Sequence, residues 1–287
     1  MGYSCDHAIV NTGVLELVRA THPTDGLNQP LHMLAGYWDE SGHADDPQCH
    51  HLGIGGLIAP ASRWARFEIM WRATLNAFDL SYFHTVDFVN YTGAFSDRDA
   101  WPETRRRALM ARLLDAIAEA RPSVHAALSS LTAWRGLAPK EQGLFQDPWF
   151  CCLQECVRLA SAHCVVDRER IDMVFSQQTE FVGKAAQLWG LMKQSSWPGF
   201  GSIGAFAMDD MRRVLPLQAA DLVAYEAVKS IGDASGTVRH PARYPFRALV
   251  GIDPNAFIVY IDASYLAWQV EGAKYMPELF SLGGDLS

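Results

Sequence analysis

Two short apolar runs, residues 33–39 and 52–59, are the first segments of the chain with a regular pattern. The residues between them include Gly42, Asp45, Asp46 and Pro47, which are types that favour turns. Apolar runs of this length that are bounded by turn formers are typical of β-strands. The pattern therefore predicts a β-hairpin.

Beyond this hairpin, segments with a helical repeat of apolar residues alternate with segments typical of strands. The helical repeat predicts helices over residues 61–78, 102–120, 148–165, 181–193 and 216–230. Strands are predicted over residues 124–131, 170–175 and 202–208. Residues 82–88 fit a short strand or an extended loop, residues 239–247 fit a basic loop with prolines, and residues 256–260 are too few to assign. A hairpin followed by this alternation predicts an α/β fold with a mixed sheet and helices on both faces.

The first 32 residues differ from the rest of the chain, since their periodicity is weak and they contain several turn formers. We expect them to form a poorly ordered N-terminal extension. Met33 directly precedes the first predicted strand, and it is a candidate for the natural start of the protein. The remaining residues, 33–287, have a length that suits a single domain with a C-terminal extension.

Composition narrows the class of protein only broadly. The chain has 287 residues, of which 49% are hydrophobic and 20% charged, as expected for a globular core. The formal net charge of −8 argues against a highly basic coat that binds nucleic acid, although an acidic protein can still contain a basic groove. Neither an apolar run of about 18 residues nor a signal-peptide pattern is present, which predicts a cytoplasmic protein that does not enter membranes. The six cysteines lack zinc-site spacing and are expected to be buried free thiols.

The first candidate for chemistry is Asp39, at the end of the first predicted strand. Side chains alternate along a strand, so Asp39 shares a face with Tyr37, whereas Trp38 and Glu40 point to the other face. If the strand continues through residue 40, Asp39 and Glu40 cannot both reach one site. We therefore prefer Asp39 as a metal ligand. The alternative is an ordinary aspartate that caps a turn.

The second candidate is Asp221, inside a helix that is apolar on almost every side. Gln218, Asp221 and Tyr225 form a narrow polar stripe on this helix, because they are three and four residues apart. A buried charge is usually retained only where it is paired or binds a metal. Asp221 is thus a metal-ligand candidate and Gln218 an orienting group. The alternative is a structural network in which Asp221 caps a neighbouring loop or pairs with an arginine.

Three further titratable residues extend this candidate site. His84 and Asp87 lie together in an irregular segment, where His84 could transfer protons or contact phosphate. The strand over residues 170–175 is followed by Ser176, and the next acidic residue is Glu180, which also suits the first turn of a helix. Several arginines could contact phosphates or simply be solvated: Arg105, Arg106, Arg107, Arg212, Arg213, Arg239, Arg243 and Arg247.

At these residues the chain resembles a prokaryotic family known as domain of unknown function 3800. The resemblance rests on Tyr-Trp-Asp-Glu-Ser-Gly at residues 37–42, Gly-Gly-Leu-Ile at 55–58, Phe-His-Thr-Val-Asp at 83–87 with Gly93 and Phe95, and Leu-Gln-Ala-Ala-Asp-Leu-Val-Ala-Tyr at 217–225. These segments span residues 33–230, which is most of the chain. Their combination is fairly specific, although each segment alone is a weak signal.

The resemblance implies a ribonuclease H-like mixed sheet that brings Asp39 close to Asp221. Proteins with this fold that act as nucleases hold Mg²⁺ or Mn²⁺ with clustered carboxylates. The implied function is a metal-dependent nuclease or phosphodiesterase with nucleic acid as its partner, linked to mobile elements or phage defence. Many relatives have an acid where this chain has Ser176, so Glu180 or Asp87 would have to complete the metal site. The alternative is a binding or regulatory protein on the same fold whose metal site is degenerate.

Overall fold

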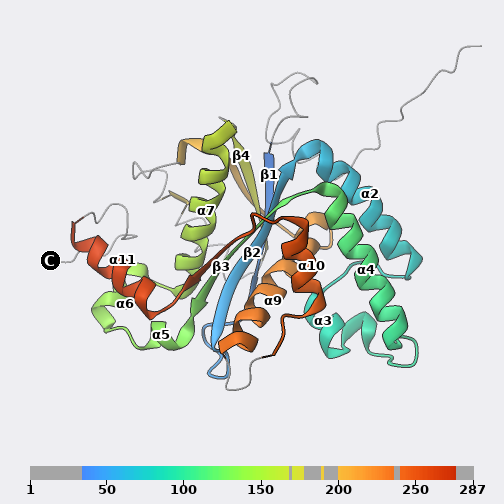
Figure 1. The fold of residues 1–287 in the computed structure, drawn as a ribbon, viewed down its shortest axis with the longest axis horizontal. Coiled ribbons are helices and arrows are strands. Elements are labelled where there is room, and N and C mark those ends of the chain that lie inside the picture. The colour runs from blue at the N-terminus through green and yellow to red at the C-terminus, as the bar shows by residue number, and fades with distance from the viewer. Residues whose placement is uncertain (1–33, 168–169, 178–188, 191–199, 236–239, 276–287) are drawn as a thin grey trace, which may run out of the picture.

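The computed structural model describes residues 34–167, 170–177, 189–190, 200–235 and 240–275. They form one mixed sheet of six strands in the order β5-β4-β1-β2-β3-β6, with helices packed against it (Figure 1). The predicted α/β class with a mixed sheet is therefore confirmed. The proposed N-terminal extension and Arg239 lie outside the described residues.

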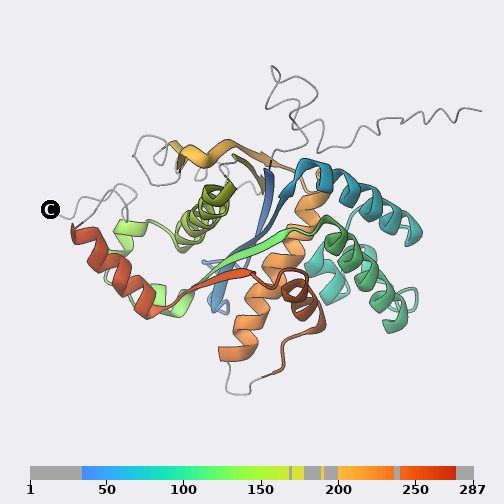
Figure 2. The ribbon, with the colours of Figure 1, turned by 45° about the horizontal axis from the view of Figure 1, so that its top comes forward.

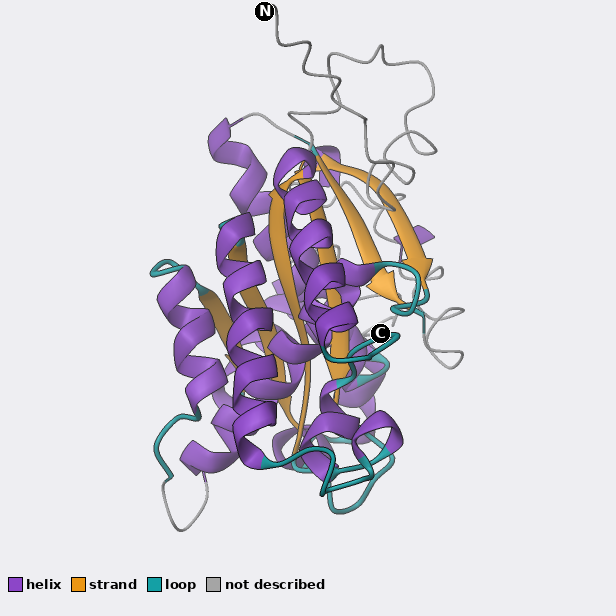
Figure 3. Cartoon of the chain, turned by 90° about the vertical axis from the view of Figure 1, so that its right-hand side faces the viewer, coloured by secondary structure: helices purple, strands orange, loops and turns teal. Residues whose placement is uncertain are grey.

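The centre of the sheet is the predicted hairpin. Strand β1 (Leu34–Ser41) pairs in antiparallel fashion with β2 (His51–Pro60), which pairs in the same way with β3 (Ser123–Ser130). On the other side of β1, strands β4 (Ile171–Ser176) and β5 (Ile203–Asp209) run parallel to it. Strand β6 (Phe257–Ile261) is parallel to β3 at the opposite edge. Because β1, β4 and β5 run in the same direction, their carboxyl ends lie at the same end of the sheet. Figure 3 shows the strands of the sheet with helices packed against them.

The two faces of the sheet bury different sets of side chains, as the alternation along β1 predicted. Tyr37 packs in the core on the side of α2 (Ala61–Ala77), α4 (Glu103–Ala120) and α9 (Leu215–Ser235). Trp38 packs on the side of α7 (Pro148–Asp167) and α11 (Ala263–Tyr275). Figure 2 shows α9 on the same side of the sheet as α2 and α4, with α7 on the other. The prediction of helices on both faces is confirmed.

Two sequence predictions are wrong. Residues 82–88 are not a strand, because residues 85–90 form the short helix α3 (Thr85–Asn90), followed by the 3₁₀ turn η2 (Gly93–Phe95). Residues 239–247 are not wholly a loop, because α10 (Tyr244–Ile252) begins within them, with Pro245 in the first turn, where proline is tolerated. The short helices α5 (Leu131–Arg135) and α6 (Pro139–Phe145), and the longer α11, were not predicted.

Three further sequence predictions concern the cysteines, membrane spans and the helix over residues 181–193. The five cysteines among the described residues are all free, and four of them are buried. None of the helices in the described part of the chain has the length and apolar character needed to span a membrane. The helix predicted over residues 181–193 lies almost entirely outside the described ranges.

Candidate functional site

A hollow of about 530 Å³ opens where β1 and β4 end, between these strands, α3 and α9. Asp39 and Asp221 both line it, although they are 182 positions apart in the sequence. Both side chains are almost fully buried, with 4% and 5% of their surface exposed. The fold therefore brings together the two acids that the sequence pointed to.

The carboxyl group of Asp39 lies in a strongly perturbed electrostatic environment. Burial raises the pKa of Asp39 well above its usual value, and the charges of Asp221 and Glu40 raise it further. Hydrogen bonds from the Glu40 N–H, at 2.9 Å, and from the Ser176 side chain counteract part of this rise in pKa. Both residues line the hollow, and the charge of Asp221 is one cause of the raised pKa of Asp39.

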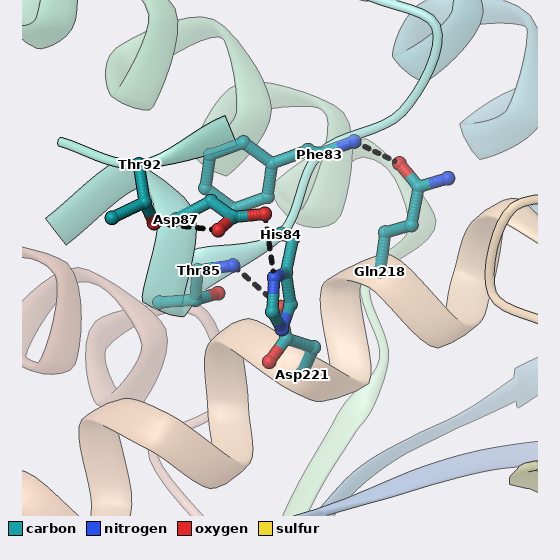
Figure 4. Close-up of polar contacts among 7 residues, drawn as sticks. All are labelled: Phe83, His84, Thr85, Asp87, Thr92, Gln218 and Asp221. Atoms are coloured by element: carbon teal, nitrogen blue, oxygen red, sulfur yellow. Dashed lines mark hydrogen bonds and ion pairs between the residues drawn. The ribbon is translucent and has the colours of Figure 1, made fainter. Parts of the chain in front are cut away.

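Asp221 is held by the start of helix α3. Its Oδ2 atom accepts a hydrogen bond from the Thr85 backbone N–H at 2.7 Å (Figure 4). Burial raises the pKa of Asp221, whereas this hydrogen bond and the nearby His84 lower it. The structural alternative is therefore right in one respect, since Asp221 caps the first turn of α3. The arginines at 212 and 213 do not pair with it: Arg213 pairs with Asp209, and Arg212 lies over the Tyr82 ring.

His84 and Asp87 form a hydrogen-bonded pair beside Asp221. His84 Nδ1 lies 2.9 Å from Asp87 Oδ2, and the imidazole lies between the two carboxylates in the view of Figure 4. Burial raises the pKa of Asp87, but hydrogen bonds from Thr92 and His84 outweigh this and leave the pKa lowered. Asp87 therefore remains ionised and orients the His84 ring. His84 lines the hollow, whereas Asp87 does not and contacts it only through the His84 ring.

Gln218 is fully buried and does not line the hollow. Its Oε1 accepts hydrogen bonds from Trp71 Nε1 and the Phe83 N–H, both at 2.9 Å, and its Nε2 donates to the Met211 carbonyl at 2.8 Å. Gln218 thus fixes the segment that carries His84, as Figure 4 shows for Phe83, and also the segment after β5. It is a positioning residue rather than one that contacts a ligand.

Gln218→Met is expected to destabilise the protein by about 2–4 kcal/mol, since the Trp71 and Phe83 donors would remain buried without an acceptor. Urea unfolding measures the change. Gln48→Met, at an exposed position in the β1–β2 loop, should leave the free energy of unfolding within about 0.5 kcal/mol of the wild-type value. Equal stabilities for the two variants would contradict the positioning role.

Glu40 also lines the hollow, contrary to the expectation that neighbouring strand residues cannot reach one site. The lining continues from Glu40 through Ser41, Gly42 and His43, so the hollow extends around the end of β1 instead of facing one side of it. Gly42 has a φ of 88°, a left-handed conformation that favours glycine at this sharp exit from the strand.

Asp210 is a lining residue that the sequence analysis missed. It follows β5 directly, and β5 runs parallel to β4 with Ser176 paired to Asp209. The two adjacent aspartates at the end of a strand were the available signal, because the carboxyl ends of parallel strands meet at one edge of a sheet. The segment after the neighbouring strand therefore contributes an acid to the hollow that Ser176 also lines.

The other residues that the sequence predicted for the site, Glu180 and the arginines, do not all lie at this hollow. Glu180 lies outside the described residues. Within the described part of the chain, no group of three or more His, Cys, Asp or Glu side chains has a geometry that could hold a metal ion. Among the arginines, Arg212 lines this hollow, whereas Arg106, Arg107 and Arg243 line a second one.

Comparisons with known proteins do not assign the chain to a family. No protein-family model, curated protein or solved structure matches it.

Proposed function

We propose that the protein is a divalent-metal-dependent nuclease or phosphodiesterase with a ribonuclease H-like fold. The fold proposal is supported by three antiparallel strands, β1, β2 and β3, which β4 and β5 continue on the β1 side in the direction of β1, so that Asp39 lies on a central strand. The observation that carries the function is the convergence of Asp39 and Asp221 on one hollow. The charge of Asp221 raises the pKa of Asp39 in this buried setting, and a cation would relieve that repulsion.

The residues of the hollow fit a hard divalent cation. Mg²⁺ and Mn²⁺ prefer oxygen ligands, and Asp39 and Asp221 would provide them in a hollow that Asp210 also lines. A bound cation of this kind supplies Lewis-acid activation of water and of the leaving oxygen.

The neighbouring side chains have separate roles in this proposal. Ser176 holds the Asp39 carboxylate through its hydrogen bond. His84, oriented by Asp87, would accept or donate a proton at the ring nitrogen that is not bonded to Asp87. Arg212 would contact a substrate phosphate, because it lines the same hollow and carries the charge that a phosphate needs.

The test is a cleavage assay with RNA, single-stranded DNA, double-stranded DNA and an RNA–DNA hybrid. We expect the full chain to cleave at least one of them with Mg²⁺ or Mn²⁺, and none with EDTA. Asp221→Asn should lower the rate at least about a hundredfold. The asparagine oxygen can still accept from the Thr85 N–H, so the fold should be retained.

Asp99→Asn is the matched control, because Asp99 is an exposed aspartate that does not line the hollow, and its rate should equal that of the wild type. A metal-dependent rate that is the same in the wild type and in Asp221→Asn would overturn the proposal.

Two observations favour a second candidate, a non-catalytic binding or regulatory protein on the same fold. Strand β4 ends in Ser176, and no metal-competent group of three side chains occurs among the described residues. Calorimetry separates the two functions. If Mg²⁺ and Mn²⁺ do not bind at millimolar concentration while Asp221→Asn folds normally, the second function is favoured.

A further inference from the structure

A second hollow, of about 590 Å³, lies between α3, the first half of α4 and the start of α10. It shares no lining residue with the first hollow, although both border α3. Its volume is within the range of pockets that bind small molecules, which is roughly 300–1,000 Å³. It is therefore large enough for a ligand of its own.

This second hollow is locally positive in an acidic chain. Three arginines line it, Arg106, Arg107 and Arg243, against one acid, Glu103. Glu103 pairs with Arg107 at 2.9 Å, and Arg243 lies 3.1 Å from the buried Glu226. Burial raises the pKa of Glu226 to about 7 even though Arg243 lowers it, so near neutral pH Glu226 balances the charge of Arg243 only in part. A net positive charge remains for an anion.

Arg106 is the most constrained of the three arginines. It is 93% buried, since only 7% of its surface is exposed, and its guanidinium carbon lies 4.0 Å from the ring centroids of both Phe88 and Tyr91. Its Nη1 donates to the Phe88 carbonyl, whereas its buried Nε has no hydrogen-bond acceptor among the described residues. The nearest carboxylate oxygen, of Glu103, is 3.8 Å away. A buried donor without an acceptor is costly, and Arg106 lines the hollow, where its charge favours an anion.

Two features beside these arginines narrow the class of ligand. Helix α10 begins at the hollow without a side-chain cap and without an acid in its first turn, so its N-terminal dipole favours an anion such as phosphate. Tyr244, the first residue of α10, lines the hollow with 56% of its surface exposed. An exposed aromatic ring is a stacking surface for a base.

We propose that the second hollow binds a nucleoside phosphate. The phosphate lies against Arg106, Arg107, Arg243 and the start of α10, and the base stacks on Tyr244. The ligand is a free mononucleotide or one nucleotide of a single strand, since both carry the same groups. The inference is independent of the proposed hydrolysis, because binding requires neither Asp39 nor a metal.

Calorimetric titration of the full chain in EDTA tests the site with three probes: adenosine monophosphate, adenosine and inorganic phosphate. We expect the monophosphate to bind at least about tenfold more tightly than either part alone, because the arginines and the ring contribute separately. Arg107→Gln should weaken the binding of both the monophosphate and phosphate severalfold. Tyr244→Ala should weaken the binding of the monophosphate and of adenosine but not that of inorganic phosphate.

Arg66→Gln is the matched control, since Arg66 is also an exposed helical arginine paired with a glutamate, and it does not line the hollow. Its affinity for the monophosphate should equal that of the wild type. Absence of binding at millimolar monophosphate, equal binding of the three probes, or equal losses in Arg107→Gln and Arg66→Gln would each overturn the proposal.

A trinucleotide with and without a 5′-phosphate identifies the source of the ligand. Binding of only the phosphorylated form supports a strand end, and binding of both forms supports an internal nucleotide. Binding of the mononucleotide but neither trinucleotide supports a free nucleotide.

Discussion

Gly55→Ala is expected to destabilise the protein by about 3 kcal/mol and to remove the metal-dependent activity proposed above. Gly55 is paired directly with Asp39 across the hairpin, so the two residues share a face of the sheet. A Cβ atom at position 55 would lie 2.5 Å from the backbone nitrogen of Ala224 and 2.6 Å from its Cα. Ala224 lies about one turn from Asp221 on α9. The added methyl group would push α9 off the sheet and take Asp221 away from Asp39.

The measurement is urea unfolding together with the cleavage assay. Gly143→Ala is the control, because a Cβ there meets nothing within 4 Å and alanine favours the helix α6 in which Gly143 lies. That variant should be as stable as the wild type or slightly more so, with full activity. If the two alanine variants behave alike, close packing of α9 on β2 does not set the position of Asp221.

The sequence predicted well those helices and strands whose pattern lies within a few neighbouring residues. The hairpin and α2 follow from apolar runs, turn residues and helical spacing within a few positions. Helix α3 was missed because it spans only six residues and its first N–H is bound by Asp221, which is 136 positions away. Helix α10 was missed because its proline was taken as a loop signal, although proline suits the first turn of a helix. Short elements that depend on distant partners leave little trace in the local pattern.

The candidate site was predictable in part for the same reason. Asp39 and Asp221 are charged residues in apolar segments. Burying a charge is costly unless it is paired or binds a metal, so both could be selected without a structure. The sequence shows Asp210 only as an acid at a strand end, because its place at the hollow depends on the parallel pairing of β4 and β5. Gln218 was predicted to be an orienting group, but the segments that it holds could not be predicted, since its three hydrogen-bond partners come from three separate parts of the chain. The sequence indicates which residues are unusual, whereas strand order decides which of them meet.

Asp39→Asn is expected to have opposite effects on activity and stability. Cleavage should fall at least about a hundredfold, as for loss of a metal ligand. The metal-free protein should instead gain about 1–2 kcal/mol at neutral pH, a typical gain when a strained functional residue is replaced. The cause is the pKa of Asp39, which is raised in the folded state by burial and by the charges of Asp221 and Glu40. The asparagine oxygen can still accept from the Glu40 N–H and from Ser176.

The pH dependence of this gain has a defined sign. A carboxyl group whose pKa is higher in the folded state favours folding at pH values below its unfolded pKa, about 3.9, and loses that stability as the pH rises. The stability advantage of Asp39→Asn, measured by urea unfolding in EDTA, should therefore be small near pH 4 and increase towards neutrality. Asp99→Asn should show no such trend, since Asp99 is exposed.

Added Mg²⁺ should stabilise the wild type but not Asp39→Asn. If Asp39→Asn is instead less stable than the wild type at neutral pH without metal, the Asp39 carboxylate is a structural partner, and the binding or regulatory function is favoured over hydrolysis.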